Sequence, residues 1–268
     1  MKENYFGVFK KLKQMQLPTE EMDLYEGFFV DFYDQSTAET TYDLDFYLKY
    51  AKEANGTILE LACGTGRVSL VLAEHGYDVL GIDTSQHMLE LLKKKKKKKV
   101  YVDGNIYTRL EDMVTFKLDE KFNLAILPAT SICLLPNDDV LLQFLDNLYE
   151  HMNVKGKFIF DYSISDISSK HPREEKPMQL FTSEEKEHKQ FVLFSEQYDY
   201  KNEVINVNFY GELIDEENIT HRKFGTTMKR LLTDEIISNV IKKSKFKVSH
   251  THVIRGNEVP VRFVVLEK

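Results

Sequence analysis

The sequence predicts an α/β fold around a mostly parallel sheet, and three short apolar runs lead to this prediction. Residues 57–61 form a run that ends in a glycine-rich turn, residues 77–83 form one that ends in an acid, and residues 122–127 form a third. Helical patterns separate these runs, and strands that alternate with helices are typical of parallel sheets. The chain has 268 residues, of which 42% are hydrophobic, so it is long enough to bury such a core and an additional part.

The first part of the chain is predicted to be helical. Residues 4–55 read as two or three helices, with aromatic side chains concentrated in residues 25–34. The last helix is expected over residues 43–54, where apolar residues recur at helical spacing, and Asn55-Gly56 marks its end. The aromatic segment either folds over a bound ligand or packs against the edge of the sheet.

The turn after the first strand is the main candidate for a ligand site. Gly64 and Gly66 let the backbone turn tightly and leave no side chain between it and a ligand. Such a turn also occurs without any ligand, so the next strand decides between the two interpretations. That strand ends at Asp83, which can accept hydrogen bonds from a ribose, because ligands of open α/β sheets lie outside the carboxyl ends of the strands. Ser69 stands where a dinucleotide fingerprint has its third small residue, which weakens a nicotinamide or flavin interpretation without excluding it.

Further segments follow this turn in a fixed order. They are Glu111-Asp112-Met113 and residues 122–131 and 156–161, downstream of Glu60-Leu61-Ala62-Cys63-Gly64-Thr65-Gly66. Together these segments resemble class I S-adenosylmethionine-dependent methyltransferases over residues 25–165. The resemblance implies S-adenosyl-L-methionine as cofactor and S-adenosyl-L-homocysteine as its product. It also implies a doubly wound, seven-stranded, mostly parallel sheet, the Rossmann-like methyltransferase fold, with an antiparallel β insertion after strand five.

The resemblance implies roles for individual residues around the glycine turn. Glu60 is expected to orient the turn or to meet the cofactor amino group, and Asp83 with the following Thr84 is expected to hold the ribose. Arg67 is interpreted either as a surface cation at a helix start or as a partner for the cofactor carboxylate. The residues expected along the methionine part of the cofactor are Ala62, Gly64 and Gly66.

Other residues are expected around the adenine and the amino group. Asp112 is expected to accept from the adenine amine, with the Met113 backbone amide on a ring nitrogen, and Met88 is expected against the adenine face. Ala129 is expected to present its carbonyl to the cofactor amino group. Many relatives have Gly-Asp where this chain has Glu111-Asp112, so either acid is a candidate for facing adenine.

Two residues are candidates for a catalytic role. Tyr33 lies in a Tyr-Asp dipeptide like one that caps the methionine end in the family, where the hydroxyl can donate to the cofactor carboxylate; the alternative is an aromatic residue packed on the sheet edge. Asp161 ends the fifth strand and is the first candidate for a general base, although strand-end acids often cap a nearby turn. No spacing of cysteine or histidine suggests a metal site.

The second half of the chain changes character after the fifth strand. A helix is expected over residues 137–152, and residues 163–190 are polar. Two strands joined at Lys201-Asn202 and a third strand follow, then a helix and a final hairpin, over residues 192–200, 204–213, 226–232, 233–243, 247–254 and 259–266. We therefore expect an N-terminal helical cap (1–55), a cofactor-binding core (56–165 and 232–268) and a β-rich insertion that forms a substrate lid (166–231).

Composition narrows the possible partners. The net charge of −7 argues against extended contact with nucleic acid, so a small-molecule substrate is expected. The lysines Lys93–Lys99 follow a helix and read as a solvated helix end, although an anionic partner stays open. No apolar run reaches the roughly 20 residues of a membrane span, and the two cysteines, Cys63 and Cys133, are expected to be reduced thiols, so the chain is expected to be cytoplasmic, as a monomer or homodimer.

The chemistry implied by the resemblance is an in-line displacement at an activated methyl group. The first hypothesis is methyl transfer to a small-molecule amine, with hydroxyl acceptors close behind. The alternatives are a tRNA- or protein-modifying methyltransferase, which predicts that the lysine run and the insertion form one basic face, and a regulator that binds the cofactor without catalysis. The chain lacks the Asn/Asp-Pro-Pro-Tyr/Phe motif of base- and glutamine-amide-modifying enzymes, since it has Leu127-Pro128-Ala129-Thr130 after strand four.

Overall fold

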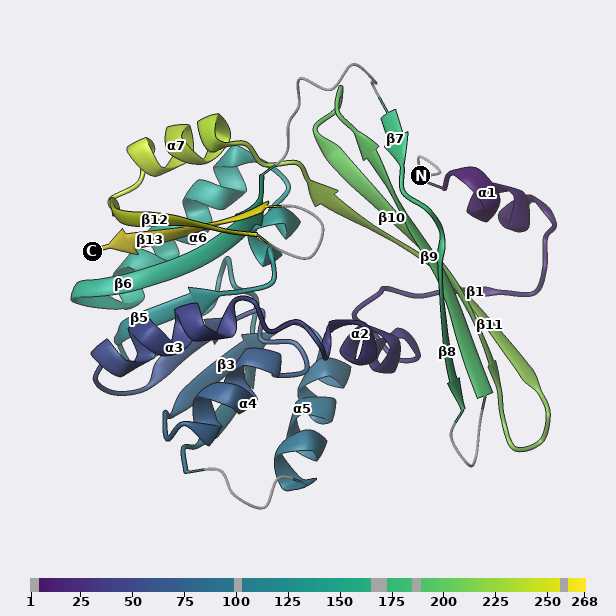
Figure 1. Ribbon diagram of the computed structural model, residues 1–268, viewed down its shortest axis with the longest axis horizontal. Coiled ribbons are helices and arrows are strands. Elements are labelled where there is room, and N and C mark those ends of the chain that lie inside the picture. The colour runs from purple at the N-terminus through teal and green to yellow at the C-terminus, as the bar shows by residue number, and fades with distance from the viewer. Residues whose placement is uncertain (1–4, 99–102, 165–172, 185–188, 256–259) are drawn as a thin grey trace. The chain divides into compact units, whose positions relative to one another are not determined.

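The computed structural model describes residues 5–98, 103–164, 173–184, 189–255 and 260–268 (Figure 1). The chain divides into two compact units. One, the core unit, contains residues 37–166 and 232–268. The other, the β unit, contains residues 1–36 and 167–231. The chain therefore passes between the units near residues 36, 166 and 231.

The core unit is built on a seven-stranded sheet with the strand order β12-β13-β6-β5-β2-β3-β4. Its strands are β2 (Ile58–Leu61), β3 (Val79–Asp83), β4 (Ile106–Leu110), β5 (Phe122–Leu127), β6 (Met152–Ser163), β12 (Lys247–Arg255) and β13 (Pro260–Glu267). Neighbouring strands from β4 to β6 pair in parallel, whereas β13 is antiparallel to both β6 and β12. The predicted doubly wound, seven-stranded, mostly parallel sheet is confirmed.

Helices cover both faces of this sheet. They are α3 (Leu44–Glu53), α4 (Arg67–Glu74), α5 (Gln86–Lys98), α6 (Asp138–His151) and α7 (Asp234–Lys243), with a short 3-10 turn η1 (Ser131–Leu134) after β5. Apolar residues of α3 and α4 pack into one buried cluster and those of α6 and α7 into another, on opposite sides of the sheet in Figure 1. Burial of these apolar faces is the main stabilising contribution to the unit.

Capping side chains fix the starts of α6 and α7, the two helices that pack together on one face of the sheet. The Asn137 Oδ1 accepts the Val140 N–H at 2.9 Å, and the Thr233 Oγ1 accepts the Ile236 N–H at 3.2 Å. Each cap satisfies one of the amide groups that a helix start leaves without a partner, an effect of about 1 kcal/mol. Both helices therefore begin where the sequence predicts.

The β unit contains an antiparallel sheet and two helices. Its strands follow the order β1-β11-β10-β9-β7, with β8 also paired to β9. The elements are α1 (Gly7–Gln14), β1 (Glu20–Glu21), α2 (Phe29–Thr37), β7 (Arg173–Glu175), β8 (Gln179–Glu184), β9 (Lys189–Asp199), β10 (Val204–Ile214) and β11 (Thr220–Arg230). Aromatic residues of α2 pack on β9 and β10; the rings of Phe29 and Phe209, for example, meet edge-on with their centroids 4.6 Å apart. The predicted antiparallel insertion is confirmed.

The structure differs from the sequence predictions in two places. The helix before the lysine run continues through Lys98, because lysine is a good helix former and its charge is favourable near a helix C-terminus. Strands β7 and β8 occur inside the stretch that the sequence marks only as polar, of which residues 165–172 and 185–188 lie outside the described part of the chain. Helix α3 lies in the core unit, whose first segment begins at residue 37; the three-part division with a helical cap over residues 1–55 stays a prediction.

Candidate functional site

The predicted site residues of the core unit converge at the carboxyl edge of the sheet. Strands β2, β3, β5 and β6 run in parallel, so the loops that follow them lie along one edge. The chain winds from β2 through β3 to β4 in one direction, and from β5 to β6 in the other. The carboxyl ends of β2 and β5 therefore lie at the topological switch point, which is where open α/β sheets bind their ligands.

The glycine turn after β2 is a series of left-handed residues. Ala62, Gly64 and Gly66 have φ angles of 49°, 54° and 80°, and Gly66 is the N-cap of α4. The Gly66 N–H donates to the Cys63 carbonyl at 2.9 Å. The turn thus offers backbone groups with little side-chain cover, a surface suited to a polar ligand.

Two close approaches explain the small residues around this turn. A β-carbon on Gly66 would lie 2.1 Å from the Leu92 Cδ1, so this glycine makes room for α5 and not directly for a ligand. A β-carbon on Gly81 would lie 2.7 Å from the Cys63 Sγ. Cys63 is buried, and burial holds the pKa of its thiol well above the usual range, so it is a packed residue under the turn. Cys63 and Cys133 are both free thiols.

Asp83 connects the turn to the end of β3. Its Oδ2 accepts the Gly64 N–H at 2.8 Å, and its Oδ1 accepts the Ser85 N–H at 2.9 Å. A carboxylate has about four acceptor positions, so it can bond to a backbone and a ligand at once. Asp83 stands within hydrogen-bonding reach of the glycine turn, as the ribose role requires, and Thr84 beside it is exposed.

Glu60 lies beneath the turn. Its side chain is 1% exposed and accepts a short hydrogen bond from the Ser69 hydroxyl on α4. Burial raises the pKa of the Glu60 carboxyl to about 7, an effect that the Ser69 hydrogen bond partly offsets. Of the two predicted roles, this contact supports the one in which Glu60 orients the turn.

Arg67 forms a buried ion pair that the sequence did not predict. Its Nη1 and Nη2 donate to the two Asp43 carboxylate oxygens at 2.7 and 2.6 Å, and Nη1 also donates to the Thr40 carbonyl at 2.7 Å. The Asp43 side chain is fully buried and that of Arg67 is 14% exposed. This geometry ties the start of α4 to the segment before α3 and favours a structural role for Arg67 over contact with a cofactor carboxylate.

Asp161 is the centre of a second buried contact. Its Oδ1 accepts from the Tyr47 hydroxyl at 3.0 Å, and its Oδ2 accepts the Thr130 N–H at 3.0 Å. The carboxyl is fully buried, and burial, followed by the charge of Asp43, raises its pKa to about 7. Asp161 therefore holds the loop after β5, where Ala129 and Thr130 both have left-handed φ angles, of 57° and 56°.

The predicted adenine residues lie beside the other strands of this edge. Asp112 is exposed, and its Oδ1 accepts the Val114 N–H at 2.6 Å. The Glu111 N–H donates to the Asp83 carbonyl at 3.0 Å, which places this segment beside the residue predicted to hold the ribose. Met88 is buried on α5 and Met113 packs on the core cluster of α6 and α7.

Tyr33 belongs to the β unit. Its ring packs edge-on against that of Tyr25, with centroids 5.5 Å apart, and it joins the apolar cluster of α2 with β9 and β10. The aromatic segment thus packs on the antiparallel sheet, and the cofactor role of Tyr33 stays a prediction.

The donor and acceptor set of the core unit fits S-adenosylmethionine. The left-handed turn offers backbone groups to a polar amino-acid portion, Asp83 offers carboxylate oxygens to a ribose, and Asp112 offers an exposed carboxylate to an amine. Ser69, buried and bonded to Glu60, occupies the position of the third glycine or alanine in the dinucleotide fingerprint, so this helix start departs from that fingerprint. Within the described ranges, no group of three acidic, histidine or cysteine side chains could hold a metal ion.

The sequence did not predict the contacts by which four residues hold Glu60, Arg67 and Asp161 in place. These residues are Thr40, Asp43, Tyr47 and Ser69. Asp43 and Tyr47 read as a helix start and an apolar helix face. One signal was available, because an arginine at the start of a buried helix needs an acidic partner. The sequence does not reveal which acid that is.

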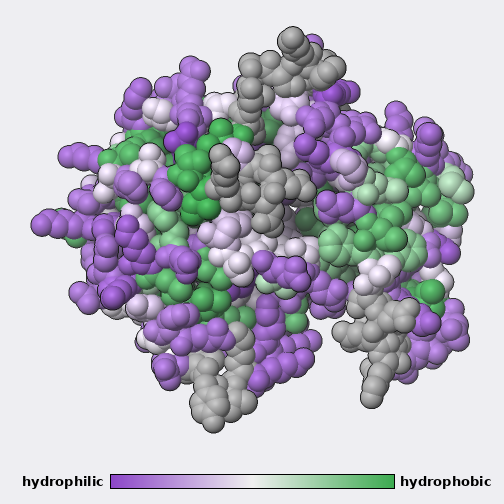
Figure 2. Space-filling view, in the orientation of Figure 1, coloured by the Kyte–Doolittle hydropathy of each residue, from purple (hydrophilic) through white to green (hydrophobic). Residues whose placement is uncertain are grey.

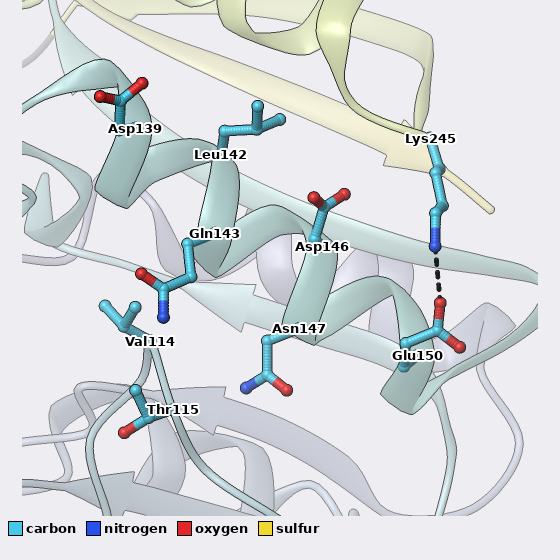
Figure 3. A pocket seen from close by; sticks show the side chains of 9 residues that line it. All are labelled: Val114, Thr115, Asp139, Leu142, Gln143, Asp146, Asn147, Glu150 and Lys245. Atoms are coloured by element: carbon cyan, nitrogen blue, oxygen red, sulfur yellow. Dashed lines mark hydrogen bonds and ion pairs between the residues drawn. The ribbon is translucent and has the colours of Figure 1, made fainter.

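A pocket lies along α6. It has a volume of about 690 Å³, and Figure 3 shows its lining. The lining includes Val114 and Thr115 from the loop before β5, side chains of α6, and Lys245, which donates to Glu150 at 2.8 Å. None of the predicted cofactor residues lines it.

Comparison with known proteins places the core unit in one family of domains. Residues 58–156 match the family model described as a methyltransferase domain. YqeM of Bacillus subtilis strain 168 is 29% identical over 140 residues, which are 52% of this chain and 55% of that protein. The cypemycin N-terminal methyltransferase of a Streptomyces species is 27% identical over 105 residues, 39% of this chain and 41% of that protein. These matches thus span about half of each relative or less.

The fold extends the likeness to nearly the whole chain. The solved structure of the sugar N-methyltransferase KedS8 from a Streptoalloteichus species superposes with a TM-score of 0.73 at 14% identity, over 93% of this chain and 96% of that one. At this identity the likeness concerns the fold. It covers the antiparallel sheet as well as the seven-stranded one, whereas the family match is limited to residues 58–156.

Proposed function

Because this chain belongs to the class I S-adenosylmethionine-dependent methyltransferases, we propose that it transfers a methyl group from S-adenosylmethionine to a small-molecule amine. The observation that carries the proposal is the joint geometry of the glycine turn and Asp83 at the switch point. Oxygen acceptors are the nearest alternative within the same chemistry.

Two of the known proteins support an amine acceptor. The cypemycin enzyme is named for N-terminal methylation, and KedS8 for methylation of a sugar nitrogen. KedS8 shares the fold over both sheets, so an antiparallel unit of this type accompanies small-molecule methylation in at least one solved structure. The net charge of −7 is also consistent with a small substrate and not with a nucleic-acid backbone.

The proposed mechanism depends on positioning. When bound, S-adenosylmethionine would supply a methyl group activated by its sulfonium, and a neutral amine could attack that methyl carbon in line, with S-adenosylhomocysteine as the leaving group and no covalent enzyme intermediate. The turn from Ala62 to Gly66 and Asp83 would fix the donor, and the Ala129 carbonyl would orient its amino group. Holding two reactants in line contributes up to about 7–11 kcal/mol in favourable cases.

The acceptor must lose a proton in this scheme. An ammonium acceptor would first release one proton to solvent to become the neutral amine. The new C–N bond would then form as the S–C bond breaks, and the methylated ammonium product could release a further proton to solvent. Asp161 is fully buried with both oxygens in hydrogen bonds, a geometry that supports a role in holding the loop more directly than a role as general base.

Among the helices of the described residues, none has the length and the apolar composition of a membrane span.

Calorimetry and a labelled methyl-transfer screen test the proposal. We expect the protein to bind S-adenosylhomocysteine and not NAD. With labelled S-adenosylmethionine, amines should accept label, and hydroxy compounds and bulk tRNA should not. Binding of NAD without binding of S-adenosylhomocysteine would contradict the cofactor, whereas label in tRNA would replace the proposed substrate class.

A further inference from the structure

The loop after β5 has an unfavourable backbone conformation. Ala129 and Thr130 are consecutive non-glycine residues whose backbones are left-handed, with φ angles of 57° and 56°. Left-handed residues other than glycine are uncommon, and they persist where the surrounding structure holds them. Ala129 is exposed and Thr130 is half-buried.

One buried side chain accounts for this conformation. The Thr130 N–H donates to the Asp161 Oδ2 at 3.0 Å, and the Asp161 Oδ1 accepts from the Tyr47 hydroxyl at 3.0 Å. Asp161 and Tyr47 are 0% and 1% exposed. The hydrogen bonds therefore form a continuous buried path from α3, through β6, to the loop after β5.

Asp161 accepts from a hydroxyl and a backbone amide, and the charged groups around it in the described part of the chain carry both signs. Asp43 and Tyr47 face it from the α3 side, Tyr42 precedes α3, and Arg67 lies at the start of α4. A buried carboxylate is expensive unless its oxygens are hydrogen-bonded. Each carboxylate oxygen of Asp161 accepts one hydrogen bond, from Tyr47 or from Thr130. An apolar residue of similar size would leave the Thr130 N–H without this acceptor.

We infer that Tyr47 and Asp161 are positioning residues for methyl transfer, which hold Ala129 and Thr130 in the conformation that presents the Ala129 carbonyl to the cofactor amino group. The inference rests on the proposed function. It assigns Asp161 an indirect role and gives Tyr47, which reads as a core residue, a part in the site.

The same strand offers a matched control. Tyr162 follows Asp161 on β6, is 1% exposed, and donates its hydroxyl to the Asp234 Oδ1 at 2.7 Å. Tyr47→Phe and Tyr162→Phe each remove one hydroxyl that donates to a carboxylate, from a tyrosine that is itself 1% exposed. Only the first lies on the path to Thr130.

The experiment measures S-adenosylhomocysteine affinity by calorimetry and the exchange rate of the Thr130 amide hydrogen by NMR. We expect Tyr47→Phe to weaken binding by about twofold to tenfold and to speed Thr130 exchange by a similar factor, the effect of one hydrogen bond. Tyr162→Phe should leave both unchanged. Asp161→Asn should bind better than Asp161→Ala, because its amide oxygen can still accept the Thr130 N–H while its NH₂ donates to the Tyr47 oxygen.

Several outcomes overturn the inference. They are wild-type binding and exchange in Tyr47→Phe, equal changes in both tyrosine variants, or faster exchange at Thr130 with unchanged affinity. If Asp161→Ala does not fold, the two tyrosine variants decide alone. If the wild-type protein does not bind S-adenosylhomocysteine, the proposed function fails, while the Thr130 exchange rates still show whether the path holds the loop.

Discussion

Two loops border the switch point, the turn after β2 and the loop after β5; we call them its two walls, and they are held in different ways. On the β2–β3 side, the left-handed Ala62 and two glycines shape the turn, and Asp83 accepts backbone N–H groups from the turn and from Ser85, just before α5. On the β5–β6 side, two residues with side chains take left-handed conformations, and a buried aspartate and tyrosine hold them. The first wall is shaped by the residues in the turn itself, and the second by residues distant in the sequence.

This difference determines what each wall tolerates. A glycine turn adopts its shape at little conformational cost but fails when a side chain is added. A wall held by side-chain hydrogen bonds fails when a distant residue is changed. The predictions below test each type of support, from the largest expected effect to the smallest.

The largest effect is expected for the ion pair behind the glycine wall. Asp43→Ala leaves the Arg67 guanidinium buried without its carboxylate, which costs about 3–5 kcal/mol of unfolding free energy. Urea unfolding measures this. The control is Glu53→Ala, which breaks a partly exposed pair with Lys157 and should cost less than about 1 kcal/mol. Equal losses in the two variants would contradict a supporting role for the buried pair.

Gly66→Ala should cost nearly as much. The new β-carbon would meet Leu92, and φ is +80°, so overpacking adds to the left-handed cost for a total of about 2–4 kcal/mol. Gly56→Ala is the control, because its φ is +90° but nothing lies within 4 Å of the added carbon. Thermal unfolding of the two variants separates the cost of overpacking against Leu92 from the cost of the left-handed backbone. Similar melting temperatures would mean that the close approach of α5 does not require glycine at position 66.

Asp83→Ala tests ligand binding at the same wall. The turn loses a charged acceptor for two backbone amides, and the ribose loses its predicted partner, so S-adenosylhomocysteine affinity should fall about tenfold to hundredfold. Calorimetry gives the constant. Asp78→Ala removes a half-buried acid just before β3 that accepts the Asn105 N–H, and the variant should bind as the wild type does. Wild-type affinity in Asp83→Ala would remove the ribose assignment.

The buried carboxyl beneath the turn predicts a pH dependence of stability. Burial raises the pKa of Glu60 from 4.5 to about 7, so between these values the unfolded chain has released a proton that the folded protein still binds. Stability from this group is therefore full below pH 4.5 and is lost as pH rises toward 7, by on the order of 1–3 kcal/mol. Unfolding of Glu60→Gln at pH 5 and pH 8 should show a smaller loss than the wild type, and parallel curves would contradict the prediction.

The smallest effect is expected at the second wall. Ala129→Gly relieves a left-handed conformation but gives the unfolded chain more freedom, so stability should stay within about 1 kcal/mol of the wild type. Thermal unfolding measures it beside Gly66→Ala. A loss above about 2 kcal/mol would mean that the alanine side chain itself supports the loop.

The comparison of the walls also explains what the sequence could reveal. The glycine turn and Asp83 lie within a few residues of strand ends, where local pattern and strand order are sufficient to predict them. The ion pair of Arg67 with Asp43 joins residues 24 positions apart, and Tyr47 bonds to Asp161 across 114 positions. Such contacts depend on packing between elements, which periodicity does not encode.

A similar limit applies to the surface. The lysine run predicts a solvated helix end, and the surface around the end of α5 is hydrophilic in Figure 2. Strands β7 and β8 are mostly exposed, so the alternation that marks a half-buried strand is weak there. Pairing with β9 places them in the sheet.

The pairing of β6 with β13 has a consequence for biogenesis. Ser163 pairs with Val261, and the intervening chain includes the insertion of the β unit. A ribosome adds about 5–20 residues each second, so β6 emerges several seconds before its partner exists. During that interval one apolar strand edge is open to other chains. Nascent-chain folding of this protein should therefore depend on what covers β6 until the C-terminal hairpin arrives.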